Sequence, residues 1–231
     1  MSTPAHDDGA GTPGAGLTLV LGSASAGRAD VLRRALLPFR VVVSEVDEQA
    51  LGRAHPGACP ARLAELLAEA KGRDVAARVA AQGVGVPTLV VGCDSVFELD
   101  GTAYGKPHEP EVAVERWRRQ SGRTGLLHTG QWAGLVLPGE DGAAVESLEL
   151  VSAAVRFAEV DEATVRAYVA TGEPLGCAGA FTVDGAGAAL VEGVDGDPNA
   201  VIGLSVSRLR AQGEALGVRL VDLWGSSNPT G

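Results

Sequence analysis

Two long strand patterns in the middle of the chain constrain its fold more than any other feature. They cover Thr124–Leu137 and Ser147–Ala158, and the turn-rich stretch Gly139–Ala143 separates them. A connection this short joins antiparallel partners, so the sheet must contain a long hairpin. Elsewhere strand patterns alternate with helical patterns, which is typical of an α/β fold. We therefore predict an α/β fold with a mixed sheet.

Hydrophobic periodicity and capping residues predict the other elements. Helices are expected over Arg28–Leu37, Pro60–Ala81, Pro110–Gln120, Asp161–Ala170 and Ile202–Leu216. Strands are expected from Leu17, over Phe39–Ser44, from Thr88 and over Ala188–Val194, with Gly172–Gly187 mostly loop. Small polar residues and glycines predict a disordered leader over 1–16 and a frayed tail over 225–231. The remainder, 17–224, is expected to form a single domain.

Composition restricts the function classes. The chain has 231 residues, of which 45% are hydrophobic and 21% charged, which is ordinary for a globular protein. It has no apolar run of the roughly 20 residues that a membrane helix needs and no secretory signal pattern. Its three cysteines are widely spaced, which suits a reducing cytoplasm. The formal net charge of −10, from 29 acids and 19 bases, argues against non-specific binding to nucleic acid or an anionic membrane.

One acidic residue follows a run of apolar β-formers. The run begins at Thr88, stops at Gly92-Cys93 and is followed by Asp94, and a short hairpin around Asp100-Gly101 then leads to Lys106 on a loop. A carboxylate at a strand end and a nearby lysine suit metal-assisted chemistry on a phosphate ester. The alternative is that Asp94 only turns the strand and Lys106 is a solvated loop charge.

The turn after the first strand is a second candidate. Ser23, Ser25, Gly27 and Arg28 lie where a strand passes into a helix, so backbone N–H groups, two hydroxyls and a guanidinium could cradle an anion. Alternatively, a serine is simply the helix N-cap and Arg28 is a surface residue. The chain has no Walker A loop, since Pro107 follows the only Gly-Lys pair.

An acidic stretch, Ser44–Glu48, follows the second predicted strand. Carboxylates together with substrate phosphates and water are the usual ligands of Mg²⁺ or Mn²⁺, so this stretch and Asp94 could share a cation. An acidic loop can equally be solvated charge.

Seven segments, taken in order, resemble the Maf family from Leu17 to about Trp224. They are LGSASAGRADVL (21–32), SEVDE (44–48), LAEAK (67–71), VVGCDSVFELDGTAYGKP (90–107), SGRTGLLHTG (121–130), YVATGEPLGCAGAF (168–181) and VEGVDGDPNAVIGLSVSRL (191–209).

This resemblance implies an elongated, twisted mixed sheet flanked by helices, with a central cleft between two lobes, and usually a homodimer. It implies a cytoplasmic hydrolase that splits nucleoside triphosphates into a monophosphate and pyrophosphate with a divalent cation, Mg²⁺ or Mn²⁺. By position, Asp94 would be the catalytic carboxylate and would share the cation with Glu48. Lys71 and Lys106 would neutralise the triphosphate. Ser23, Ser25 and Arg28 would bind phosphate.

The chain departs from the family pattern at three substrate-binding positions. Gly27 stands where many members carry the first of two arginines, Ser95 replaces a threonine, and Asp184 replaces Gln or Glu at a position that the family links to base choice. A carboxylate there could accept hydrogen bonds from a guanine-type N1–H and amino group.

Two other functions remain compatible with these residues. The first is a regulator of cell division that binds nucleotide without turnover, as the family's septum phenotype permits. The second is the same pyrophosphatase reaction on deaminated purines such as inosine triphosphate. The presence of Asp94, Lys71, Lys106 and Glu48 favours catalysis.

Overall fold

The computed structural model describes residues 16–224 and has a seven-stranded mixed sheet at its centre. The strands are β1 (Thr18–Leu21), β2 (Arg40–Val41), β3 (Thr88–Leu99), β4 (Thr102–Tyr104), β5 (Thr124–Val136), β6 (Ala143–Phe157) and β7 (Val191–Asp195). Their order is β2-β1-β3-β5-β6-β7, with β4 paired to β3. β1 is parallel to β2 and β3, whereas all other pairs are antiparallel. The predicted mixed sheet and its long hairpin, β5–β6, are therefore confirmed.

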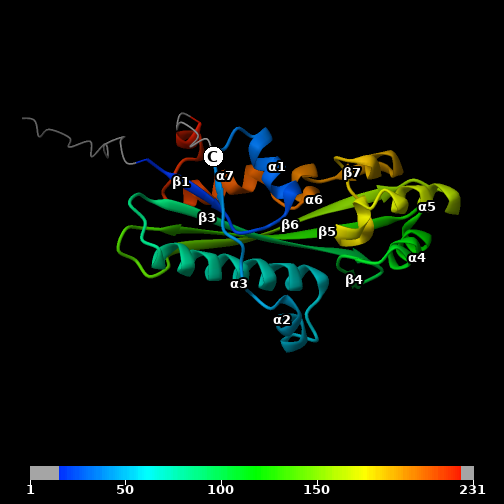
Figure 1. Ribbon diagram of the computed structural model, residues 1–231, viewed down its shortest axis with the longest axis horizontal. Coiled ribbons are helices and arrows are strands. Elements are labelled where there is room, and N and C mark those ends of the chain that lie inside the picture. Colours follow the sequence, from blue (N-terminus) through cyan, green and yellow to red (C-terminus); the bar gives the residue numbers. More distant parts are fainter. Residues whose placement is uncertain (1–15, 225–231) are drawn as a thin grey trace, which may run out of the picture.

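Helices cover both faces of this elongated sheet (Figure 1). They are α1 (Ala26–Arg34), α2 (Glu48–Ala54), α3 (Pro60–Ala81), α4 (Pro110–Gln120), α5 (Glu162–Ala170), α6 (Pro198–Ile202) and α7 (Val206–Ala215). The long α3 lies on one face, and α1, α6 and α7 lie on the other. α4 and α5 close the far end of the molecule (Figure 1). No helix among residues 16–224 is long and apolar enough to cross a membrane.

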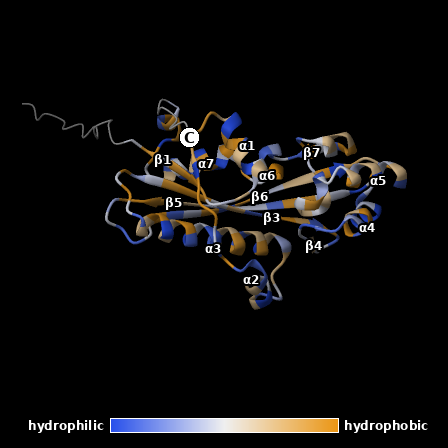
Figure 2. Ribbon diagram, viewed as in Figure 1, coloured by the Kyte–Doolittle hydropathy of each residue, from blue (hydrophilic) through white to orange (hydrophobic). Residues whose placement is uncertain are grey.

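The alternation of side chains along β3 divides the core. Val90 packs on the α3 side with Val75 and Trp132, whereas Leu89 and Val91 pack on the opposite side with residues of α1 and α7. Figure 2 shows the hydrophobic residues gathered on the strands and on the inward helix faces. Burial on both faces explains why β3 reads as a continuous apolar run.

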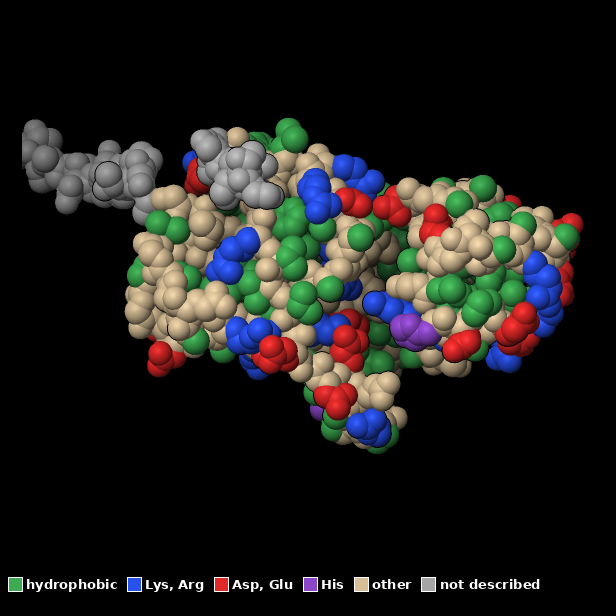
Figure 3. All heavy atoms as spheres, in the orientation of Figure 1, with side chains coloured by type: hydrophobic (Ala, Val, Ile, Leu, Met, Phe, Trp, Pro, Cys, Tyr) green, Lys and Arg blue, Asp and Glu red, His purple; other side chains and the backbone are tan. Residues whose placement is uncertain are grey.

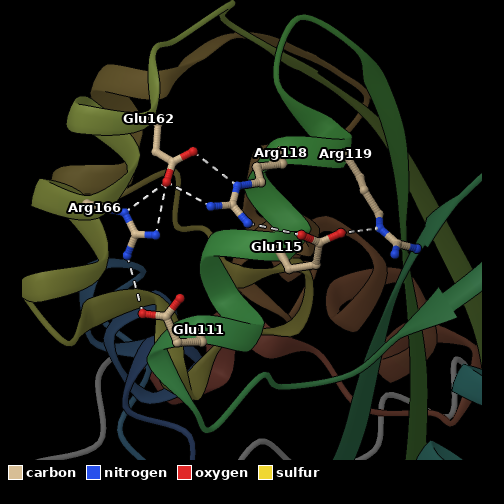
Figure 4. Close-up of polar contacts among 6 residues, drawn as sticks. All are labelled: Glu111, Glu115, Arg118, Arg119, Glu162 and Arg166. Carbon is tan, nitrogen blue, oxygen red and sulfur yellow. Dashed lines mark hydrogen bonds and ion pairs between the residues drawn. The ribbon is translucent and has the colours of Figure 1, made fainter.

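The far end is held by an aromatic core and a surface ion-pair network. Edge-to-face ring pairs join Trp117 of α4 to Phe157 and Tyr168. Outside this core, arginines and glutamates of α4 and α5 alternate in contact (Figure 4). In this network Glu162 accepts hydrogen bonds from Arg118 of α4 and from Arg166 of its own helix.

The structure differs from the predicted elements in four places. β3 does not stop at Gly92 but continues to Leu99, so Asp94 lies within a strand rather than at its end. The acidic stretch runs into a helix, α2, that the sequence pattern did not predict. The predicted second strand shrinks to the two residues of β2. The predicted closing helix Ile202–Leu216 begins only at Val206, as α7, because the unpredicted short helix α6 ends at Ile202 and Gly203 follows it with a φ of +123°.

The glycine-rich stretch is mostly loop, as predicted, and contains short 3-10 turns at Glu173–Gly176, Ala178–Ala180 and Ala186–Leu190. A further such turn lies at Leu220–Leu223. The predictions of a leader over 1–16 and a tail over 225–231 lie outside the described residues, apart from Gly16.

Candidate functional site

The site is built around a gap in the pairing of one edge of β3. β1 pairs with β3 only over Thr88–Val91, and its ladder ends with a 2.8 Å bond from Gly22 N to the carbonyl of Val91. β4 pairs with β3 only over Phe97–Leu99. Among residues 16–224, the segment between these pairings, 92–96, has no strand neighbour on that edge. This gap brings Asp94 and Ser95 to an open edge in the middle of the sheet.

On the α3 face of the sheet, two carboxylates converge on one ammonium group. Lys71 Nζ lies 2.5 Å from Asp94 Oδ1 and 2.7 Å from Glu48 Oε1. The Asp94 and Lys71 side chains are each 12% exposed, whereas Glu48 is 56% exposed at the rim. Tertiary structure therefore assembles a cluster from α2, α3 and β3.

The other acids of the Ser44–Glu48 stretch have different partners. Asp47 is the N-cap of α2, where its Oδ1 accepts a 2.9 Å bond from Ala50 N. Glu45 pairs at 2.9 Å with Arg78 of α3. Of these three acids, Glu48 is the one that contacts Lys71.

Glycines bring α3 onto the sheet beside this cluster. A Cβ at Gly92 would lie 2.6 Å from Gly72 Cα, and a Cβ at Gly72 would lie 2.2 Å from the Trp132 ring. Neither contact can accommodate a methyl group, so helix and strand touch backbone to backbone. Because Lys71 precedes Gly72 and Asp94 follows two residues after Gly92, this close contact sets the separation of their side chains.

Arg28 occupies the opposite face of the same edge. It is only 9% exposed, and its Nε donates to the carbonyl of Gly203 at 2.9 Å. Its Nη1 donates to Ser23 Oγ at 2.9 Å and its Nη2 to Ser95 Oγ at 3.2 Å. Ser25 is the N-cap of α1, as its alternative interpretation predicted, but Arg28 is not a surface residue.

The remaining candidates lie around this centre. Gly27 faces α6, since a Cβ there would lie 3.0 Å from Ile202 Cγ2. Lys106 is exposed on the loop after β4, and no hydrogen bond or ion pair is found for it within residues 16–224. Asp184 lies 3.4 Å from Arg34 at the end of α1. The structure thus joins Asp184 to α1, rather than to Asp94.

Cys93, the residue before Asp94, is fully buried. Burial raises the pKa of the Cys93 thiol to about 12. The thiol therefore stays neutral and is no nucleophile. Figure 3 shows the surface hollowed between the two halves of the molecule, with basic and acidic side chains on the rim.

A separate hollow of about 540 Å³ lies between α4 and α5. Its lining includes Arg118 and Glu162, which are already paired with each other, and none of the candidate residues at the open edge of β3. The geometry and charge at the open edge of β3 make that edge the better candidate.

The sequence patterns did not identify Glu173, a carboxylate that holds the glycine-rich loop near Asp184 through several hydrogen bonds. Glu173 accepts hydrogen bonds from the hydroxyls of Tyr168 and Thr182 and from the backbone N–H groups of Ala186 and Gly187, at 2.5–3.0 Å. Burial raises the pKa of Glu173, but these bonds outweigh it and hold the pKa below its ordinary value. Its presence in the segment YVATGEPLGCAGAF was the available signal.

Comparisons with known proteins show what the chain as a whole is similar to. The family model described as "Maf-like protein" matches residues 18–215. A protein of Leifsonia xyli subsp. xyli named "Nucleoside triphosphate pyrophosphatase" is 44% identical over 212 residues, which is 90% of this chain and 97% of that protein. A protein of the same name from Streptomyces coelicolor is 44% identical over 213 residues, or 92% of this chain and 97% of its own.

Proposed function

The chain belongs to the Maf-like protein family, and from this we infer that it is a nucleoside triphosphate pyrophosphatase, as its similar relatives are named. Water would attack the α-phosphorus, the bond from that phosphorus to the bridging oxygen would break, and pyrophosphate would leave. One observation carries this proposal: Asp94, Lys71 and Glu48 cluster on one face of the open edge of β3, and the buried Arg28 lies on its other face.

Asp94 is the proposed base. Its Oδ1 contacts Lys71 Nζ at 2.5 Å, so its position is restrained while Oδ2 is left to accept a proton from water. Lys71, Lys106 and Arg28 supply positive charge for the phosphates. Such local charge is necessary because a triphosphate is strongly anionic and the chain carries a net charge of −10.

The donor set fits a divalent cation such as Mg²⁺ or Mn²⁺. Asp94 and Glu48 already converge on one positive group, the Lys71 ammonium. No cluster of three or more His, Cys, Asp or Glu that could hold a metal lies within residues 16–224. Two carboxylates suffice for Mg²⁺ when substrate phosphates and water complete its shell. When bound, the cation would neutralise charge on the phosphates.

The test is pyrophosphate release over a panel of standard, methylated and deaminated nucleoside triphosphates with Mg²⁺ or Mn²⁺. Asp94→Asn should lower kcat by about 10²–10⁴-fold, because a positioned general base contributes that much. Asp100→Asn is the matched control: it makes the same chemical change in the β3–β4 turn, where φ is +53° and Asn is well tolerated. Full activity of Asp94→Asn would reject the catalytic role.

The nucleotide panel also separates the alternatives. Binding of nucleotide with no release of pyrophosphate above the protein-free rate would favour a regulator. We propose that Asp184 selects a guanine-type base and that Asp184→Gln moves the preference toward pyrimidines. The family resemblance also supports a homodimer in the cytoplasm, which light scattering and cell fractionation test.

A further inference from the structure

Arg28 is the first member of a chain of hydrogen bonds that runs along one face of the sheet, from β3 to β5. Arg28 Nη2 lies 3.2 Å from Ser95 Oγ, and Ser95 Oγ lies 2.8 Å from Thr129 Oγ1 on the neighbouring strand β5. Thr129 Oγ1 in turn lies 2.8 Å from the carbonyl of Ala200 in α6. Thr129 is 0% exposed, so its hydroxyl cannot reach a substrate.

The direction of every bond in this chain is determined. A carbonyl oxygen can only accept a hydrogen bond, so the Thr129 hydroxyl donates its single proton to the carbonyl of Ala200. Thr129 must then accept the proton of Ser95, and Ser95 is left with only lone pairs toward Arg28. Arg28 can only donate, which matches. Reversing the Ser95–Thr129 bond would take the Thr129 proton away from Ala200 and leave two acceptors, Thr129 Oγ1 and the Ala200 carbonyl, facing each other.

Helix α6 closes the chain into a ring. Arg28 Nε donates to Gly203, the residue after α6, while the relay through Ser95 and Thr129 ends on Ala200 within α6. One N–H on each of the three guanidinium nitrogens is thereby bound to protein. The second N–H of each terminal nitrogen remains for a ligand. The protein thus holds the plane of the guanidinium from several sides.

We propose that Thr129 is a positioning residue that orients the Arg28 guanidinium for phosphate, acting through the Ser95 hydroxyl. This inference rests on the proposed function only in assigning phosphate to Arg28. Without the Thr129 hydroxyl, Ser95 loses its acceptor and can turn its proton toward Arg28, which then loses a partner. Imperfect orientation weakens a charge-assisted bond, so the KM for the triphosphate rises by about tenfold while kcat changes little.

The experiment compares Thr129→Val, which keeps the shape but loses the hydroxyl, with Thr129→Ser, which keeps the hydroxyl. Two measurements are made: steady-state kinetics gives KM and kcat for the best nucleotide, and calorimetry gives the Kd of inorganic tripolyphosphate with Mg²⁺. Thr129→Val should raise KM and Kd by about tenfold, and Thr129→Ser should restore both to within about twofold. Equal impairment of the two variants, or an unchanged Kd in Thr129→Val, would overturn the proposal.

A double-mutant cycle separates positioning from general damage. In an Arg28→Ala background, Thr129→Val should weaken tripolyphosphate binding no further, because the residue through which it acts is gone. An additive loss would refute the relay. Should Thr129→Val fail to fold, Ser95→Ala breaks the same chain and enters the same cycle with the same expected outcome.

The two measurements also keep this inference distinct from the proposed function. Failure of the wild-type protein to release pyrophosphate from any nucleotide would reject the pyrophosphatase, while the tripolyphosphate cycle would still test Thr129. Failure of the wild-type protein to bind tripolyphosphate would overturn the role assigned to Arg28 and hence to Thr129.

Discussion

Replacing Gly92 by alanine should damage both stability and activity through one backbone contact. The added Cβ would lie 2.6 Å from Gly72 Cα, 2.7 Å from Gly72 N and 3.0 Å from the carbonyl of Ala68. Carbon atoms prefer a separation of about 3.5–4.0 Å, so α3 must retreat from β3 by about 1 Å. All three atoms are backbone atoms, so no side-chain rotation relieves the clash.

The expected cost follows from this overpacking. Extra methyl groups in a packed core destabilise by about 1–3 kcal/mol, which lowers the Tm by about 2–12 °C in a domain of this size. The same retreat moves Lys71 away from Asp94, which it now contacts at 2.5 Å. A misplacement of about 1 Å can reduce turnover by about 100-fold. Gly92→Ala should therefore lose more activity than its folded fraction explains.

Thermal unfolding and pyrophosphate release per folded molecule measure the two effects. Gly52→Ala is the matched control, because Gly52 lies in helix α2 with nothing within 4 Å of its added Cβ. That change should leave the Tm unchanged or raise it slightly, since alanine favours a helix. A wild-type Tm in Gly92→Ala would refute the close contact. A lowered Tm with normal turnover would show that this contact does not position Lys71.

Three further predictions concern groups away from the open edge. Gln212→Leu removes the partner of Gln131 in a buried amide pair with a 3.0 Å bond, so urea denaturation should show a loss of about 1–3 kcal/mol. Glu173 has a lowered pKa, so it stabilises the fold fully above the ordinary carboxyl value of 4.5, and this contribution disappears as the pH falls through the lowered value. The Tm advantage of wild type over Glu173→Gln should accordingly be present at pH 7 and shrink in acid; an advantage independent of pH would contradict this. Glu162→Gln breaks exposed pairs with residues such as Arg118, so it should lower the Tm slightly at low salt and not at 1 M salt.

Local sequence was sufficient for the regular elements. Helices Pro60–Ala81 and Pro110–Gln120 have the predicted bounds, because their periodic apolar faces and early prolines are local signals. The hairpin between β3 and β4 also lies where Asp100-Gly101 indicated, with positive φ at both residues.

Local sequence failed where the meaning of a residue depends on a distant partner. Gly92 resembles a strand terminator, yet it lies inside β3 because α3 approaches the strand there. Gly203 interrupts a helical pattern that the neighbouring residues would have continued. Its carbonyl accepts a hydrogen bond from Arg28 Nε. The sequence alone does not distinguish a glycine that ends a helix or strand from a glycine that allows another backbone segment to pack closely against it.

The sequence by itself determined which chemical groups are available: a carboxylate after a run of apolar β-formers, a nearby acidic stretch, and a few bases in an acidic chain. Only the tertiary structure decided that β1 ends at Leu21, which leaves one edge of β3 without a strand neighbour beside Asp94 and Ser95. It also decided that these adjacent residues serve opposite faces, one toward Lys71 and the other toward Arg28. Side-chain periodicity is a local property of the backbone, whereas the partner of each charge is set by contacts between segments far apart in the chain.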